Sequence, residues 1–243
     1  VVHLFRPFSK KYFMDVLPKS VKKIAVLDRA KESNGFDVLY SDVVNIYNGE
    51  RNNPLIIGGR YGISSKNVSL EDLYSVYKNL DSKNPINSFT IGIKDDVTGK
   101  SLKPSKIKNN KKNIEMLIYG YGSDGMISAS KDIVKEIGES TEGFTQGYFQ
   151  YDSKKSGGVT KCHLRFNDNI IRSTYYVNSP SLIVITKDVY LSKFETLSNI
   201  KENGTVIINT TLDKDEILSY IPSNDLKILK DKNILYKGEN HGD

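Results

Sequence analysis

The stretch YGYGSDGM, residues 119 to 126, holds three glycines between an apolar run and a segment of helical pattern. Glycines let the backbone turn tightly and approach a ligand closely, and the open N–H groups at the start of a helix favour an anion. The spacing of Gly120, Gly122 and Gly125 fits the dinucleotide-binding fingerprint, which also needs an acidic residue at the end of the next strand. Asp152 ends the next predicted strand. The stretch therefore predicts a site for one or more phosphates.

Two lysines follow Asp152 in the sequence DSKKSGG. Ligands of open α/β sheets bind beyond the carboxyl ends of the strands, so Lys154 and Lys155 would lie beside the glycine loop at one edge of the sheet. Two ammonium groups suit several phosphates better than one ribose hydroxyl, which argues against a nicotinamide or flavin cofactor. A glycine motif or a lysine pair alone is most often a turn, and only their combination at consecutive strand ends supports a site.

The remaining residues with chemical potential fit structural roles better. Cys162 and His163 are neighbours in one predicted strand, so their side chains point to opposite faces and cannot form a nucleophile and base pair. Asp95 and Asp96 close a predicted strand, where neighbouring acids are typical of a turn or a helix cap rather than a metal site. We therefore predict no catalytic residue and no metal ligand in this chain.

The alternation of strand-length apolar runs with amphipathic segments predicts the fold class, which is α/β with two mainly parallel-sheet units. The first unit is expected to hold strands at 1–8, 22–28, 53–59 and 87–93 and helices at 9–18, 40–48 and 69–80. The second is expected to hold strands at 114–122, 145–152, 159–166, 181–187 and 204–210, helices at 126–138, 190–200 and 213–221, and an edge strand at 229–237. Ser9 and Ser69 mark helix starts, and Asp72 stands at the capping-box position after Ser69. Arg29 and Arg60 each follow a strand and are candidates to bridge domains.

The positive charge of the chain is concentrated in one segment. Six lysines, as many as the net charge of +6, lie in KSLKPSKIKNNKK, which has no acidic and no aromatic residue. Such a stretch is typical of a solvated linker and not of a nucleic-acid surface, so no nucleic-acid partner is expected. Residues 99–112 are predicted to form a mobile, lysine-rich linker.

The composition also narrows the class of protein. With 243 residues and 38% hydrophobic residues, the chain can form one large or two ordinary domains with real cores. No apolar run approaches the roughly 18 residues that cross a bilayer, so no membrane partner is expected. The single cysteine, Cys162, excludes an internal disulfide and a multi-cysteine cluster, and it favours a reducing compartment, predicted to be the cytoplasm. The start VVHLFRPF has no initiating Met and no signal-peptide pattern, which indicates a piece of a longer chain.

Several long runs resemble, in one order, the central part of the pyruvate:ferredoxin (flavodoxin) oxidoreductase or pyruvate synthase family. These runs are KKIAVLDR, IIGGRYGISSK, FTIGIKDDVT, YGSDG, QGYFQYDSKKSGGVTKCHLRF and IRSTYYV. The resemblance extends over nearly the whole chain, and long matched runs are far more specific than the glycine motif. Members of this family are large enzymes with thiamine diphosphate and iron–sulfur clusters that make acetyl-CoA from pyruvate and CoA.

The resemblance implies a domain organisation and a ligand. Residues 1–98 would be the end of an incomplete transketolase-C-terminal-like domain and its connection, 113–237 a gamma-type 2-oxoacid oxidoreductase domain that binds CoA, and 238–243 a polar end. Carried over residue by residue, the CoA-binding positions are Gly122, Ser123, Asp124, Gly125, Met126 and Lys154. The sequence departs from the family at Met126 and Ser130, which replace the more usual Thr and Asn of GSDGTVGANK.

The resemblance also implies what lies elsewhere in the parent enzyme. Thiamine diphosphate sites of this class need a GDG followed by an Asn-bearing segment, and the nearest match here is the terminal HGD. Thiamine diphosphate, Mg²⁺ and the 4Fe–4S clusters would therefore belong to the rest of the parent, and this chain alone is expected to be inactive. The implied partners are the other domains of the parent, a second copy in a homodimer, and ferredoxin, flavodoxin or a fused reductase.

Two other functions stay open at this point. One is a non-catalytic packing module with a vestigial loop, and the other is an NAD- or FAD-binding dehydrogenase domain.

Overall fold

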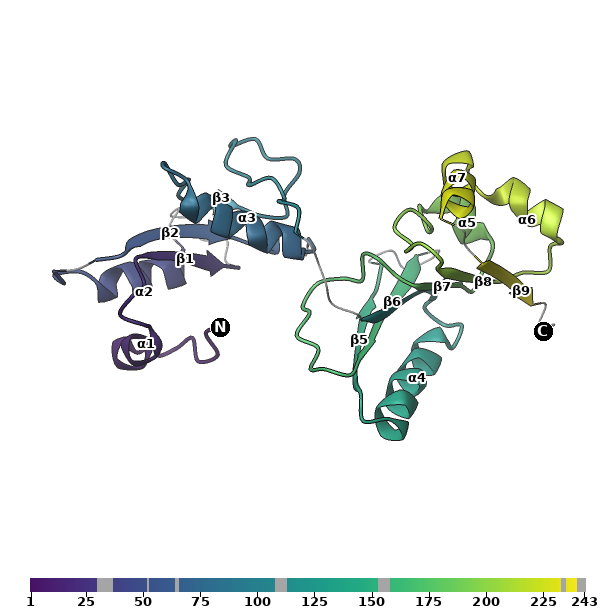
Figure 1. The fold of residues 1–243 in the computed structure, drawn as a ribbon, viewed down its shortest axis with the longest axis horizontal. Coiled ribbons are helices and arrows are strands. Elements are labelled where there is room, and N and C mark those ends of the chain that lie inside the picture. Colours follow the sequence, from purple (N-terminus) through teal and green to yellow (C-terminus); the bar gives the residue numbers. More distant parts are fainter. Residues whose placement is uncertain are drawn as a thin grey trace. The chain divides into compact units, whose positions relative to one another are not determined.

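The computed structural model describes residues 1–29, 37–51, 53–63, 66–107, 113–152, 158–232 and 235–239. The chain divides into two compact units, Val1–Asn109 and Asn110–Asp243, each with its own sheet (Figure 1). In both units most strand pairs are parallel and helices cover the sheet, so the predicted fold class is confirmed.

The first unit is a three-stranded parallel sheet with helices on both faces. β1 (Lys23–Asp28), β2 (Leu55–Arg60) and β3 (Phe89–Thr90) pair in that order. α1 (Lys10–Val16) and α2 (Val38–Ile46) lie on one face, and α3 (Leu70–Asp81) lies on the other (Figure 1). The two faces have separate cores, one around Val26 and Val43 and one around Ile57 and Val76, because alternate side chains of each strand point to opposite sides.

The predicted helix starts at Ser9 and Ser69 in the first unit are confirmed, whereas the strand predicted at residues 1–8 is wrong. The Ser9 hydroxyl accepts a hydrogen bond from the Tyr12 N–H, and Ser69 and Asp72 form both bonds of a capping box. Residues 1–8 form no strand. Pro7 has no N–H to donate to a sheet, and the Arg6 guanidinium instead pairs with Asp42 on α2.

The first residues of the predicted lysine-rich linker contact the first unit. The Leu102 N–H donates to the Thr90 carbonyl, the Ser105 N–H donates to the Glu71 carbonyl, and Leu102 packs against the α3 core. These contacts hold residues 101–105 on the first unit, because one leucine in the lysine-rich stretch finds apolar neighbours. Residues 108–112 lie outside the described part of the chain.

The second unit is a six-stranded sheet in the order β5-β6-β4-β7-β8-β9. Its strands are β4 (Ile114–Tyr121), β5 (Phe144–Gln150), β6 (Val159–Asn167), β7 (Leu182–Ile185), β8 (Thr205–Asn209) and β9 (Leu235–Glu239). The pairs β4–β7, β7–β8 and β8–β9 are parallel. β6 runs antiparallel to both β4 and β5. The sheet is therefore mixed at one side, which the sequence pattern does not reveal.

The helices of the second unit divide between the two faces of its sheet. α4 (Met126–Ser140) covers one face, and α5 (Val189–Lys193), α6 (Lys214–Tyr220) and α7 (Ser223–Asp231) cover the other (Figure 1). The helix predicted at 190–200 is shorter than expected, because Phe194 is extended and Leu197 and Ile200 reach the core from an irregular segment. α7 was not predicted, and it takes up the first residues of the predicted edge strand at 229–237.

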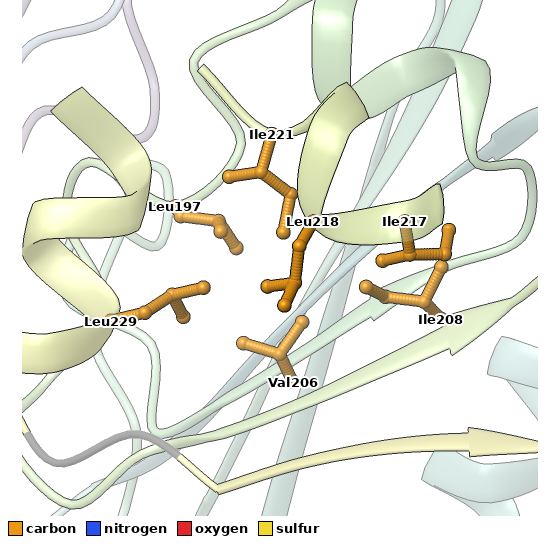
Figure 2. A pocket seen from close by; sticks show the side chains of 7 residues that line it. All are labelled: Leu197, Val206, Ile208, Ile217, Leu218, Ile221 and Leu229. Atoms are coloured by element: carbon orange, nitrogen blue, oxygen red, sulfur yellow. The ribbon is translucent and has the colours of Figure 1, made fainter. Parts of the chain in front are cut away.

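A small apolar cavity lies where α6 and α7 pack on β8. Figure 2 shows its lining, which is entirely aliphatic and consists of Leu197, Val206, Ile208, Ile217, Leu218, Ile221 and Leu229. Its volume of ≈ 10 Å³ is at the lower limit for one water molecule, and the lining offers a water no polar partner. This cavity is a packing feature of the core and not a ligand site.

Within the described ranges, the structure has no helix that combines the length and the apolar character needed to cross a membrane.

Candidate functional site

The glycine loop lies at the carboxyl edge of the second sheet, between β4 and α4. β5 and β4 run in the same direction, because each is antiparallel to β6, and β7 and β8 are parallel to β4. The loop after β4, the β5–β6 hairpin and the segment after β7 therefore meet at one edge of the sheet. This is the edge at which open α/β sheets bind their ligands.

Gly125 gives the loop its conformation. Its φ of +79° lies in the left-handed region that disfavours residues with a Cβ, and it stands at the N-cap of α4. The N-cap residue has no side chain to accept a hydrogen bond from the first turn of the helix. The space where a Gly125 Cβ would stand is empty. The N–H groups in the first turn of a helix have no partner within the helix. The loop therefore leaves donors for an acceptor from outside.

Asp124 organises the loop through its carboxylate. One oxygen accepts hydrogen bonds from the Tyr121 N–H at 2.8 Å and from the Thr186 hydroxyl at 2.9 Å, and the other accepts from the Met126 N–H at 3.0 Å. The side chain thus joins the end of β4, the first residue of α4 and the segment after β7. The negative charge of Asp124 also compensates part of the partial positive charge at the N-terminus of α4.

The side chain of Met126 belongs to the core and not to the loop surface. It is 6% exposed and packs with Ile118 and with Cys162, whose Sγ lies 3.9 Å from the Met126 Sδ. The Met126 sulfur also fills the space where a Cβ of Gly120 would stand, so Gly120 is needed for this close approach. Of the predicted CoA-binding residues, Gly122, Ser123 and Gly125 are exposed in the loop, whereas Met126 offers a ligand little beyond its backbone.

Lys154, the remaining predicted site residue, lies outside the described residues, as does Lys155. The base of their hairpin is described. A Cβ at Gly158 would lie 2.8 Å from the Asp152 Cβ, so the two ends of the hairpin are close together. Val159 pairs with Tyr121, and the Thr160 hydroxyl lies 3.7 Å from the position of a Gly122 Cβ. The hairpin base therefore stands beside the glycine loop.

A second group of residues at this edge was missed in the sequence analysis. Thr186 and Lys187 follow β7, Lys161 lies near the start of β6, and Tyr119 and Tyr121 stand at the end of β4. The Nζ of Lys161 lies 5.1 Å from the centre of the Tyr119 ring, and the Nζ of Lys187 lies 5.3 Å from that of Tyr121. A polar Lys161 inside an apolar strand and a Thr-Lys pair at a strand end were the available signals.

Burial changes the acidity of two groups of this cluster. Burial, together with the nearby charge of Asp225, raises the pKa of the Tyr119 hydroxyl to about 12. Burial also lowers the pKa of the Lys161 ammonium group. Both directions follow from the cost of placing a charge in a medium of low dielectric.

The other candidates from the sequence have structural roles. His163 is 4% exposed, accepts a hydrogen bond from the Val177 N–H and stacks on Tyr176, whereas Cys162 packs on the α4 face. The two side chains face opposite sides of the sheet, as expected. Within the described ranges, no cluster of three or more His, Cys, Asp or Glu residues could hold a metal ion.

The predicted roles of the acids and arginines in the first unit are partly confirmed. Asp96 accepts hydrogen bonds from the N–H groups of Thr98 and Ser101, and Asp95 pairs with Lys66, so the turn is confirmed but no helix is capped. Arg60 pairs with Asp37, the N-cap residue of α2, within its own unit. The guanidinium group of Arg29 lies against Gly62.

The fold and the loop together define a class of protein domain, which is a mixed α/β domain with a glycine loop at the carboxyl edge of its sheet. Residues 115–235 match the sequence model of the family described as pyruvate ferredoxin/flavodoxin oxidoreductase. Through these residues, the chain belongs to the pyruvate ferredoxin/flavodoxin oxidoreductase family.

Individual relatives agree with this assignment. The chain is 41% identical over 241 residues to the pyruvate:ferredoxin oxidoreductase of Moorella thermoacetica, covering 97% of this chain and 20% of that protein. It is 41% identical over 239 residues to a probable pyruvate-flavodoxin oxidoreductase of Escherichia coli, covering 95% of this chain and 20% of that protein. The chain thus spans about a fifth of the length of these relatives.

Among solved structures, the pyruvate oxidoreductase subunit PORC of Thermotoga maritima matches with a TM-score of 0.38 and 21% identity. The match covers 46% of this chain and 57% of that one.

Proposed function

We propose that this chain is part of an oxidoreductase that converts pyruvate and CoA to acetyl-CoA and passes electrons to ferredoxin, flavodoxin or a fused reductase. In this proposal the second unit binds CoA, and its glycine loop cradles a phosphate group. Thiamine diphosphate, Mg²⁺ and the 4Fe–4S clusters lie in other parts of the parent, since one cysteine cannot hold a cluster. The observation that carries the proposal is the open loop at Gly125, at the carboxyl edge of a sheet in a chain of this family.

The loop supplies donors and the hairpin supplies charge. Gly122, Ser123 and Gly125 leave the backbone exposed, and the first turn of α4 adds N–H groups and its dipole. Asp124 fixes the shape of the loop, and Met126 anchors it to the core. Lys154 belongs to a hairpin whose base stands beside the loop, and a lysine suits a flexible diphosphate.

A specific observation favours a second candidate function. The Asp124 carboxylate already accepts the first N–H of α4, so part of the anion site is filled by the protein itself. A loop closed in this way would serve packing between domains and would bind no phosphate. The second candidate is therefore a packing module with a vestigial loop.

The arrangement of the strands speaks against a dinucleotide-binding domain. In that fold, the strand after the first helix lies next to the first strand and parallel to it. Here the antiparallel strand β6 lies between β4 and β5. Asp152 therefore follows a strand two positions away from the glycine loop, or about 10 Å at the usual strand spacing.

Calorimetric titration of the 243-residue chain with CoA, NADH and FAD separates these functions. We expect CoA to bind most tightly. Lys154→Ala should weaken CoA binding about tenfold to a hundredfold, because it removes a charge-assisted contact. Gly125→Val should abolish binding, because a β-branched residue is strained at this φ.

Lys131→Ala is the matched control, since Lys131 lies on α4 against Phe149 and is expected to leave CoA binding unchanged. Circular dichroism checks the folding of each variant. The proposal is wrong if both site variants fold and bind CoA as well as the parent chain, or if NADH binds more tightly than CoA. A chain that binds none of the three ligands supports the packing module.

The 243-residue chain alone is expected to catalyse no oxidation of pyruvate. Purified chain, reconstituted anaerobically with iron and sulfide and supplied with thiamine diphosphate and Mg²⁺, should neither decarboxylate pyruvate nor develop iron–sulfur absorbance. A visible cluster band after this treatment would contradict the assignment of the clusters to other parts of the parent.

A further inference from the structure

Two lysines flank the end of β4 on the face of the sheet opposite α4. Tyr119 and Tyr121 are two residues apart in one strand, so their side chains point to the same face. The Lys161 ammonium group lies over Tyr119 from β6, and the Lys187 ammonium group lies over Tyr121 from the segment after β7. Phe194 adds a second ring, with its centre 6.0 Å from the Lys161 Nζ. Lys161 thus covers the buried ring of Tyr119, and Lys187 lies over the ring of Tyr121 farther along the same strand.

Neither lysine has an anionic partner within the described part of the chain. No carboxylate in the described ranges lies within 4.0 Å of the Nζ of Lys161 or Lys187, whereas six ion pairs form elsewhere in these ranges. Lys161 is half-buried, and burial lowers the pKa of its ammonium group. A partly desolvated cation without a counter-ion is costly, and an incoming anion would relieve that cost.

Both lysines are tied to the glycine loop through their chain neighbours. Thr160, next to Lys161, lies against Gly122, with its hydroxyl 3.7 Å from the position of a Cβ there. Thr186, next to Lys187, donates a hydrogen bond to Asp124 at 2.9 Å. Lys161 and Lys187 therefore stand at strand ends that border the loop, with Lys161 on the opposite face of the sheet from Thr160.

We propose that Lys161 and Lys187 form a second anion subsite that binds a phosphate monoester of the ligand whose diphosphate lies at the glycine loop. The inference rests on the proposed function, since CoA carries such a group as its 3′-phosphate. A phosphate monoester bears a charge of about −1.5 to −2 at neutral pH, more than one phosphate of a diphosphate bridge, and so suits two ammonium groups. The aromatic rings would hold the lysine stems in place beside it.

The competing explanation is that the rings alone satisfy the two lysines. Cation–π contacts of this length are a common feature of protein surfaces, and Lys131 on the other face makes one with Phe149 at 5.8 Å. Lys131 is therefore the matched control, because it shares the aromatic contact and lies on the α4 face of the sheet.

The test compares CoA with 3′-dephospho-CoA, which keeps the diphosphate and lacks the monoester. Lys161→Met keeps the apolar stem and removes the charge. We expect it to weaken CoA binding about tenfold and 3′-dephospho-CoA binding less than about twofold, as for the loss of one charge-assisted contact. Lys187→Met, at a more exposed residue, should weaken CoA binding about threefold. Lys131→Met should change neither ligand.

The outcomes separate the two proposals. If the parent chain does not bind CoA at all, the proposed function fails. If the parent chain binds CoA but Lys161→Met weakens both ligands equally, or weakens neither, the second subsite is wrong while the glycine loop stands. Equal affinity of the parent chain for CoA and 3′-dephospho-CoA would also overturn the subsite.

Discussion

The two units treat glycines at a strand end in opposite ways. At the end of β2 in the first unit, the spaces beside Gly58 and Gly59 are filled by the rings of Tyr40 and Phe89. After β4 in the second unit, the space beside Gly125 is empty and the residue is exposed. Gly58 and Gly59, like Gly120 in β4, make room for the protein's own side chains, whereas Gly125 leaves room that the protein does not use.

The helix starts at the carboxyl edges of the two sheets differ in the same way, as α2 after β1 and α4 after β4 show. In the first unit, Asp28 is 6% exposed and accepts the N–H groups of Leu39 and Tyr40 at the start of α2. In the second unit, Asp124 is exposed and accepts only the first N–H of α4, that of Met126. A glycine-rich strand end therefore becomes a candidate ligand site only where its own fold leaves it open.

The largest expected effect is that of Gly59→Val in the first unit. A Cβ at Gly59 would collide with the ring of Phe89, which is fully buried and has no room to move. We expect this overpacking to lower the free energy of unfolding of the first unit by about 3 kcal/mol. Urea unfolding measures the loss, and adding Phe89→Leu should recover part of it. A fully stable Gly59→Val variant would show that this strand end is not closed by packing.

The next effect depends on pH and belongs to the second unit alone. Burial, with the positive charges of Lys161 and Arg165, lowers the pKa of His163 to about 4 from its ordinary value of 6.5. Between these values the unfolded chain binds a proton that the folded chain does not, so the free energy of unfolding falls as the pH falls from 6.5 to 4. The expected loss is roughly 3 kcal/mol and is complete below about pH 4.

Urea unfolding at pH 7, 5.5 and 4 would measure this loss. His163→Phe keeps a ring beside Tyr176 and cannot titrate, so it should remove this part of the pH dependence from the second unit. The stability of the first unit should not show this step, because His163 belongs to the second unit. An unchanged pH profile in His163→Phe would show that His163 is not the titrating group.

A smaller effect is expected from weakening the hydrogen bonds of Asp28 to the start of α2. Asp28→Asn replaces a carboxylate that accepts two N–H groups by an amide that presents one oxygen. We expect a loss of about 1 to 2 kcal/mol in the free energy of unfolding of the first unit. Asp124→Asn, at the exposed counterpart, should cost less than about 1 kcal/mol. Equal costs at both positions would contradict the distinction between a closed and an open edge.

Local signals in the sequence predicted much of the fold. The capping box of Ser69 and Asp72 depends on residues three apart, and the apolar runs of β4 and β7 are sufficient to mark strands. The direction of β6 was not predictable in this way, because it depends on which strand it joins and not on its own pattern. Residues 1–8 have a strand-like pattern but find no partner strand, which a single sequence cannot reveal.

The candidate site was predicted in its loop and missed in its surroundings. The spacing of the glycines up to Gly125 is a local pattern that the sequence displays directly. Lys161, Lys187 and Tyr119 lie at one edge only because β4 and β7 end there and β6 begins there. Likewise, the sequence places Met126 in the loop, but its side chain packs in the core against Ile118 and Cys162. Tertiary contacts, which no spacing rule contains, decide both cases.

The smallest expected effect on stability is at Gly122. Its φ is not positive, and a Cβ there would meet only the Thr160 hydroxyl, at an ordinary contact distance of 3.7 Å. We therefore expect Gly122→Ala to change the free energy of unfolding by less than about 0.5 kcal/mol. The fold thus has no need of glycine at this position, in contrast to Gly59. If Gly122→Ala also leaves CoA affinity unchanged, the glycine has no role in an open phosphate site. A stable variant with weakened CoA binding would instead assign Gly122 to the ligand, since close approach of the backbone to a phosphate is the remaining reason for a residue without a side chain.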